Sequence, residues 1–205
     1  MSEIGLFPLP LVLLPTEQLP LHIFEDRYKE LIGECLADDL EFGLVFADDD
    51  GVREIGTRAG VVEVLPPPFP DGRMNVLVEG RERFRVLELT EGRSFHTADT
   101  TPVDDDDDPP SDEVVERARM LFGRLREMTG SNVEIPDPAF PQLSYALASR
   151  VELASEVKLG LLAEISERIR LEQVCEILEE AAISVERQRR AAERAATNGK
   201  VDTSL

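Results

Sequence analysis

The chain has 205 residues, 42% of them hydrophobic, with 42 acidic and 22 basic side chains and a formal net charge of −20. This hydrophobic fraction is sufficient for a folded core and excludes a wholly disordered chain. A surface this acidic repels phosphate groups at long range, which counts against nucleic acid or an acidic membrane as the main partner.

The N-terminal fifteen residues are apolar, but prolines interrupt them and an acid, Glu3, stands where a signal peptide carries basic residues. No stretch approaches the ~20 apolar residues of a membrane span. We therefore expect a soluble, cytoplasmic protein. The two cysteines, Cys35 and Cys175, match no metal-ligand or disulfide spacing, so we expect both to be buried and we expect no metal or cofactor.

Residues 1–103 are dominated by alternation of apolar and polar side chains, which predicts β-strands. The clearest runs are FGLVF at 42–46, NVLVE at 75–79 and RERFRVLEL at 81–89. Glycines fall between or within these runs, where turns and bulges need them. Many short strands at this spacing are typical of a small β-barrel.

The segment LPLHIFEDRY, Leu19–Tyr28, passes from an extended run directly into a helical pattern. Two carboxylates begin the helical part, where the exposed N–H groups and the positive end of the helix dipole favour them. An arginine there can pair with a carboxylate, and a tyrosine can anchor the helix to the strands. We interpret four residues as a structural junction: Phe24, Glu25, Arg27 and Tyr28.

A catalytic group made of His22, Glu25 and Asp26 is the alternative interpretation of this junction. Such chemistry also needs an activated nucleophile and an oxyanion hole, and no serine or cysteine lies close in the sequence. The chain has only two histidines and no glycine-rich phosphate loop or metal-ligand pattern. We therefore expect a non-enzyme, with no catalytic residues.

The composition changes at DDDDDPPSDE, which begins at Asp104. Consecutive carboxylates repel one another and prolines block regular structure, so residues 104–112 are predicted to be an exposed acidic linker. Residues 113–196 follow with helical periodicity; Ser111 can cap the first helix and Gly130 can end it. Residues 197–205 are predicted to be a flexible tail. The predicted fold is α+β: a small β-barrel, then a helical bundle with a long last helix.

Four blocks, in order along the chain, carry a resemblance to a known family. They are FPLPLVLLPTEQLPLHIFEDRYKELI near the N-terminus, FGLVF at 42–46, IGTRAGVVEV at 55–64 and DGRMNVLVEGRERFRVLEL at 71–89. These blocks resemble the N-terminal, substrate-binding domain of the ATP-dependent Lon proteases, and LASRVEL, LGLLAEIS and RLEQVCEIL resemble its helical portion. The match spans roughly residues 4–185 and implies a PUA-like β-barrel followed by a helical subdomain.

The resemblance implies a stand-alone module that binds unfolded or exposed apolar protein segments. A full Lon protease carries a nucleotide-binding module and a Ser–Lys proteolytic module after this region. This sequence has no GxxxxGK[ST] motif, and its only lysines are Lys29, Lys158 and Lys200. The family's catalytic residues therefore have no matching positions here.

The loop LPPPFPDG, residues 65–72, is the first candidate binding surface. Prolines stiffen it, and a rigid loop presents an aromatic side chain at a low ordering cost. Leu65, Pro67 and Phe69 are the candidate peptide-binding residues. The alternative is that Phe69 folds back and closes one end of the barrel.

A basic stripe on one predicted strand, with a further arginine across the hairpin, is the second candidate surface. Because PUA folds often bind RNA, the stripe motivates an RNA-binding alternative; the net charge and the lack of interleaved exposed aromatics disfavour it. Nearby carboxylates also explain these arginines as ion-pair partners. The candidate basic surface consists of Arg73, Arg81, Arg83 and Arg85.

The last predicted helix ends in ERQRRAAERAA, which is charged and rich in alanine. This end can project beyond the bundle and associate with a second copy of the chain. The remaining candidate partner is a Lon-type or other AAA+ protease, for which the chain would act as an adaptor or regulator.

Overall fold

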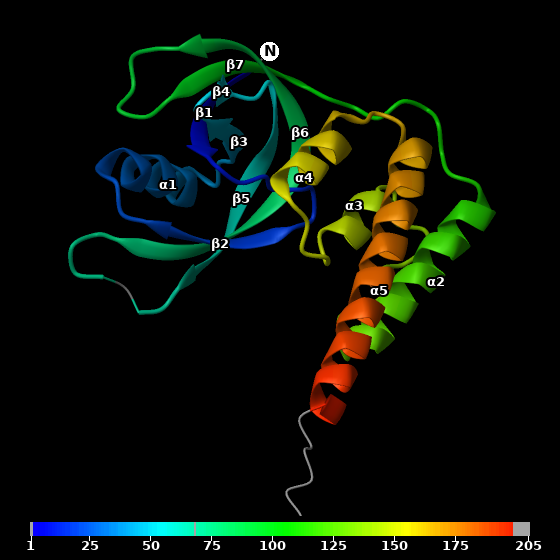
Figure 1. Cartoon of the computed structure of the whole chain (residues 1–205). Coiled ribbons are helices and arrows are strands. Elements are labelled where there is room, and N and C mark those ends of the chain that lie inside the picture. Colours follow the sequence, from blue (N-terminus) through cyan, green and yellow to red (C-terminus); the bar gives the residue numbers. More distant parts are fainter. Residues whose placement is uncertain (1, 68, 199–205) are drawn as a thin grey trace, which may run out of the picture.

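A computed structural model describes residues 2–67 and 69–198 of the chain (Figure 1). The strands are β1 (Ser2–Leu9), β2 (Gln18–Ile23), β3 (Phe42–Asp48), β4 (Gly51–Val52), β5 (Ile55–Leu65), β6 (Met74–Thr90) and β7 (Thr97–Pro102). The helices are α1 (Asp26–Asp38), α2 (Asp112–Thr129), α3 (Leu143–Ala148), α4 (Ser155–Ala163) and α5 (Glu167–Asn198). The fold is α+β, as the sequence predicts.

The seven strands form one sheet in the order β1-β7-β6-β5-β3-β4, with β2 paired to β6. All pairs are antiparallel except β1 with β3. Because β3 pairs with β1, the strands β1, β7, β6, β5 and β3 form a closed series of pairs. The long strand β6 organises the sheet. Its first half pairs with β2 and β5, and its second half pairs with β7 and β5. Two segments far apart in sequence, β2 and the β5–β6 loop, thereby come to the same end of the sheet.

The strand core is built from the alternation that the sequence predicts. In β6, Val76 and Val78 are fully buried, while Leu77 between them is half-buried on the opposite face. Helix α1 packs against this core through Tyr28, Leu31 and Ile32. Burying such apolar side chains stabilises the fold by about 1.5–3 kcal/mol each.

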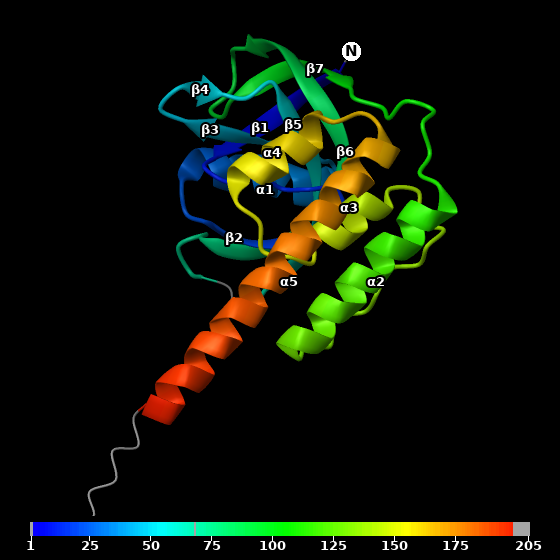
Figure 2. The same cartoon turned by 45° about the vertical axis from the view of Figure 1, so that its right-hand side comes forward.

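Helices α2 and α5 lie side by side, and α5 extends past the end of α2 (Figures 1 and 2). The Ser111 side chain accepts a hydrogen bond from the Val114 N–H at 3.4 Å, and Gly130 ends α2 with a φ of 69°. Both residues act as the sequence predicts. The last helix includes Thr197 and Asn198, which the predicted tail contained; the rest of that tail lies outside the described residues.

The acidic segment after β7 differs from the exposed linker that the composition predicts. It has no helix or strand, and three of its five aspartates are exposed, but Asp105 and Asp108 are half-buried. Asp105 pairs with Arg83 of β6 and Arg170 of α5, and Asp108 pairs with Arg168 at 3.2 Å. These arginines neutralise the two carboxylates and override the repulsion within the run. The segment therefore ties the sheet to the helices.

Candidate functional site

An exposed aromatic cluster lies on the outer face of β2. The His22 ring stacks on Phe24 with 5.9 Å between ring centroids, and Phe69 meets it edge-on at 5.6 Å. The Arg73 guanidinium lies 5.0 Å from the Phe69 ring centroid. Phe24 is 59% exposed. We call these four residues, His22, Phe24, Phe69 and Arg73, the aromatic patch.

The alternating directions of the side chains along β2 explain why His22 and Phe24 lie in the patch. Leu21 and Ile23 point into the core, so His22 and Phe24 point outward. In the antiparallel register His22 lies opposite Asn75 of β6, and the His22 Nδ1 and Asn75 Oδ1 atoms are 2.7 Å apart. This hydrogen bond orients the imidazole between the two phenylalanine rings.

The loop between β5 and β6 supplies the other half of the patch. The Gly72 N–H donates to the Phe69 carbonyl at 3.2 Å, and Arg73 pairs with Asp71 at 2.7 Å. Because β6 pairs with β2, the returning loop sets Phe69 against His22. Phe69 is half-buried on the patch and lies outside the core clusters. Of the other two loop candidates, Leu65 is half-buried at the end of β5 and Pro67 is exposed.

The junction residues divide into two groups. Glu25 pairs with Arg27 at 2.7 Å, Arg27 lies 4.6 Å from the Tyr28 ring centroid, and Tyr28 stacks on Phe7 at 3.9 Å. This chain of contacts fastens the start of α1 to the strands. Phe24 does not share that role, because its exposed ring points away from the core. The interpretation of Phe24 as a structural residue is therefore corrected.

The sequence predicts no binding role for His22 or Phe24. Its alternative interpretation places His22 in a catalytic group, whereas the structure gives this ring aromatic neighbours and an amide partner. Its position in an alternating strand next to Phe24 indicates an outward side chain. No local pattern links position 22 to position 69, because their contact depends on the pairing of both segments with β6.

The four arginines of the candidate basic surface do not form one exposed stripe. Arg83 is only 2% exposed, since the helices cover this part of β6. Its inclusion in a surface is therefore corrected. Every one of the four pairs with a carboxylate, which removes the excess positive charge that a phosphate backbone requires. The pairs are Arg73–Asp71, Arg81–Glu41, Arg83–Asp105 and Arg85–Glu54.

A buried ion cluster joins the sheet to the helices. Arg170 pairs with Asp105 at 2.6 Å and with Glu167 at 2.5 Å, and its Nε donates to the Ser144 hydroxyl at 2.8 Å. Arg83 pairs with Asp105 and donates to the backbone carbonyls of α4 and the α4–α5 connection. We call these five residues, Arg83, Asp105, Ser144, Glu167 and Arg170, the ion clasp.

The ion clasp balances two guanidinium groups against two carboxylates. Burial alone would raise the pKa of Asp105, but the hydrogen bond from Arg170 and the charges of Arg170 and Arg83 lower it below its usual range. Burial raises the pKa of Tyr145, whose ring lies 4.1 Å below the Arg170 guanidinium, to about 12. Asp105 is therefore ionised and Tyr145 is neutral at neutral pH, which suits a structural tie.

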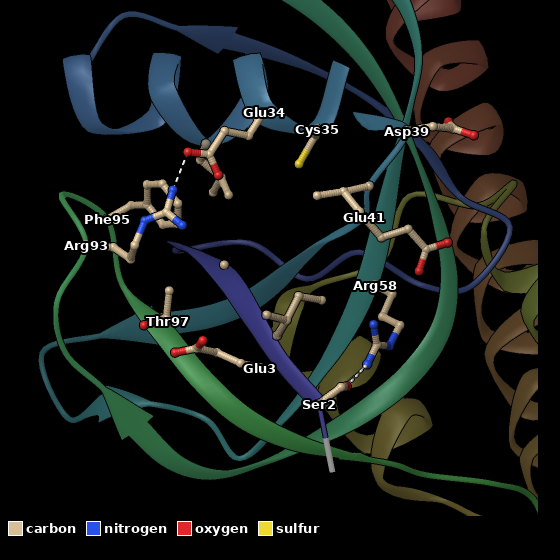
Figure 3. A pocket seen from close by; sticks show the side chains of 14 residues that line it. Ser2, Glu3, Glu34, Cys35, Asp39, Glu41, Arg58, Arg93, Phe95 and Thr97 are labelled. Atoms are coloured by element: carbon tan, nitrogen blue, oxygen red, sulfur yellow. Dashed lines mark hydrogen bonds and ion pairs between the residues drawn. The ribbon is translucent and has the colours of Figure 1, made fainter. Parts of the chain in front are cut away.

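A pocket of about 350 Å³ lies between α1, β1 and β7 (Figure 3). Arg93 pairs with Glu34 across it, and Arg58 donates to the Ser2 hydroxyl at 3.0 Å. Burial and then the Glu34 charge raise the pKa of the Cys35 thiol to about 11, so this thiol is a poor nucleophile. No histidine is among the residues that line the pocket.

Among residues 2–67 and 69–198, no group of three or more metal-ligating side chains converges on one point. Over the same residues, no helix has the length and apolar character needed to cross a membrane.

Comparison with known proteins assigns the chain to a family. The family model of the ATP-dependent protease La (LON) substrate-binding domain matches residues 3–180. The chain belongs to this family. The matched range includes the residues of the aromatic patch and of the ion clasp.

The similar full-length proteins are much longer than this domain. The Lon protease of Brucella suis is 27% identical over 194 residues, which cover 85% of this chain and 23% of that protein. Lon protease 1 of Hydrogenovibrio crunogenus is 24% identical, over 82% of this chain and 22% of its own length. The chain thus spans less than a quarter of these relatives.

Solved structures of isolated Lon domains have the same fold. A Lon N-terminal domain protein from Xanthomonas campestris is 26% identical with a TM-score of 0.66, over 85% of this chain and 97% of that one. The N-terminal domain of a Mycobacterium avium complex Lon protease is 16% identical with a TM-score of 0.62, over 88% and 98%. The second likeness concerns the fold alone.

Proposed function

We propose that this Lon substrate-binding domain is a non-catalytic module that binds unfolded or exposed apolar protein segments through the aromatic patch. The observation that carries the proposal is the exposure of Phe24, a large aromatic side chain that the core does not use. It adjoins two further rings, and aromatic side chains grouped in this way supply most of the binding energy at protein interfaces.

The rest of the fold acts as a support for this surface. We infer that the ring of five paired strands is a small PUA-like barrel within residues 1–103 and that residues 113–196 form a helical subdomain. Residues 104–112 connect the two, and the ion clasp holds them in a fixed arrangement. A rigid support lowers the entropy cost of binding, because the patch does not need to be ordered when a peptide arrives.

A partnership with a Lon-type or other AAA+ protease is the second function that an observation favours. Helix α5 continues beyond the end of α2 (Figure 2). The end of α5 carries Arg190, which also lies 3.7 Å from Glu186, and the exposed Arg194, on a chain whose net charge is −20. A basic helix end is suited to an acidic surface on a protease, or to a second copy of this acidic chain.

The patch is tested by the variants Phe24→Ala and Phe69→Ala. We expect each to weaken binding of a reduced, alkylated and therefore unfolded test protein by about tenfold. The free energy of unfolding should change by less than about 1 kcal/mol, since neither ring is in the core. Met120→Ala on α2 is the matched control, because Met120 is 67% exposed far from the patch. A variant that lost stability but kept full binding would contradict the proposal.

A further inference from the structure

We propose that the bound polypeptide adds as a β-strand along the free edge of β2, with one end at the aromatic patch and the other in an acidic cleft. This inference rests on the proposed function and names the class of segment that the domain takes. The segment is extended, carries an aromatic residue, and carries a basic residue several positions away.

The hydrogen bonds at the start of β2 show which backbone groups are free. The Gly80 N–H donates to the Glu17 carbonyl at 2.8 Å, immediately before Gln18 pairs with Glu79. A Cβ atom at Gly80 would lie 2.1 Å from the Leu14 carbonyl oxygen, so only glycine permits this close crossing. In an antiparallel pair the bonding direction alternates from one residue to the next.

This alternation divides the residues of β2. Leu19, Leu21 and Ile23 direct their backbone groups to β6, whereas Gln18, Pro20 and His22 direct theirs to the opposite edge. Pro20 is consistent with this division, because proline has no N–H and the pairing with β6 needs no N–H donor at position 20. The free edge therefore presents three carbonyl acceptors and two N–H donors.

No strand of the described residues covers that edge. Strand β2 pairs with β6 alone, and none of the turn or loop hydrogen bonds within residues 2–67 and 69–198 reaches the backbone of Gln18, Pro20 or His22. All three residues are exposed. Buried and unpaired backbone groups would cost about 1–3 kcal/mol each, so these groups are hydrated and available. An extended polypeptide offers the complementary row of donors and acceptors.

An acidic cleft of about 740 Å³ lies at the Gln18 end of β2. Its carboxylates are Glu79 of β6 and Glu134 and Asp137 of the α2–α3 loop, and none of the three has an ion pair among the described residues. Arg150 is the one basic side chain in the lining. The cleft is therefore negatively charged and attracts a lysine or arginine side chain.

The two ends of β2 set the spacing of the recognised residues. The aromatic patch lies at the Phe24 end and the cleft at the Gln18 end. Six residues at about 3.3 Å each separate them by about 20 Å. A bound strand would then place an aromatic side chain and a basic side chain about four to six positions apart. Main-chain hydrogen bonds tolerate most other side chains, which suits a domain that binds many different segments.

The strand geometry is tested by methylating peptide backbone nitrogens one position at a time. The probe is a labelled peptide of about twelve residues with one phenylalanine and one lysine about five positions apart, and fluorescence anisotropy with the full chain measures its affinity. Methyl groups at alternate positions should weaken binding about tenfold, because they block hydrogen bonds to β2, and those between should weaken it less than about threefold.

The outcomes separate the two proposals. Equal effects at all positions would overturn strand addition but leave the aromatic patch in place, provided that Phe24→Ala still weakened the parent peptide. A parent peptide that failed to bind, while the unfolded test protein still bound, would contradict strand addition alone. An effect of methylation that alternates from one peptide residue to the next would indicate backbone pairing, because an interaction through side chains alone would not produce it.

The cleft is tested by replacing the peptide lysine with norleucine, which has no charge. We expect this change to weaken binding to the native chain about threefold, and to have little effect on the double variant E79Q/E134Q. The control D106N/D107N changes the net charge equally at two exposed aspartates outside the cleft, and it should respond like the native chain. The same response in all three proteins would overturn the role of the cleft.

Discussion

The ion clasp and the aromatic patch use the same pair of chemical groups in opposite environments. In the clasp, Arg170 is fully buried and lies 4.1 Å from the Tyr145 ring centroid. In the patch, Arg73 is exposed and lies 5.0 Å from the Phe69 ring centroid. Burial makes the first contact necessary for folding, whereas water can replace most of the second. An arginine–aromatic contact therefore indicates stability or binding only once its burial is known.

Removing the buried arginine should have the largest effect on stability among changes to the ion clasp. Arg170→Met leaves the buried Asp105 and Glu167 carboxylates without their shared partner. We expect a loss of about 3–5 kcal/mol, measured by urea unfolding. Arg187→Met, at an exposed position on the same helix, should change stability by less than about 0.5 kcal/mol. Equal losses from the two variants would break the distinction between buried and exposed arginines.

Asp105→Asn should have a smaller effect that depends on pH. The pKa of Asp105 is lower in the folded chain than in the unfolded chain. The stabilisation is therefore complete above the unfolded value of about 4 and is lost as the pH falls through the folded value. We expect a loss of about 2 kcal/mol at pH 7, and we expect the difference from the native chain to shrink as the pH falls below about 4. Asp106→Asn, an exposed neighbour, is the control; unfolding curves with the same pH dependence for all three proteins would contradict the assignment.

Phe24→Ala should change stability by less than about 0.5 kcal/mol although it removes a large side chain. The ring is 59% exposed, so little apolar area returns to water in the variant. Tyr28→Ala, four positions later in the same junction, should cost about 3–5 kcal/mol because Tyr28 is buried against Phe7. Thermal unfolding of the two variants measures the contrast, and a large loss from Phe24→Ala would show that the ring is structural.

The smallest expected effect is on the rates at which the two buried thiols are chemically modified. One thiol lies beside the strands and the other in the last helix, so each rate reports on one region. Cys35 lies in α1 beside the strands and Cys175 lies in α5, and burial raises the pKa of both. Both should react slowly with iodoacetamide at pH 8 in the native chain. Arg170→Met should speed the modification of Cys175 more than that of Cys35, as followed by mass spectrometry. Phe24→Ala should alter neither rate.

Local patterns in the sequence predict most of the elements and only part of the site. Ser111 and Gly130 delimit α2 as expected, because caps depend on residues within one helical turn. The outward position of Phe24 follows from the alternation of β2, although the sequence places this residue in the predicted structural junction. The burial of Arg83 and Asp105 has no local signal, because their partners lie in helices far along the chain.

The sequence alone determined the α+β class, the order of strands and helices, and the resemblance to the Lon substrate-binding domain. These follow from periodicity, caps and residue blocks, all of which act over short distances along the chain. Only the tertiary structure decided that Phe69 meets His22 and that Arg170 meets Asp105. Those contacts arise from the pairing of β2 with β6 and the packing of α5 against the acidic segment, and burial then decides which charges and rings stabilise the fold and which remain available for binding.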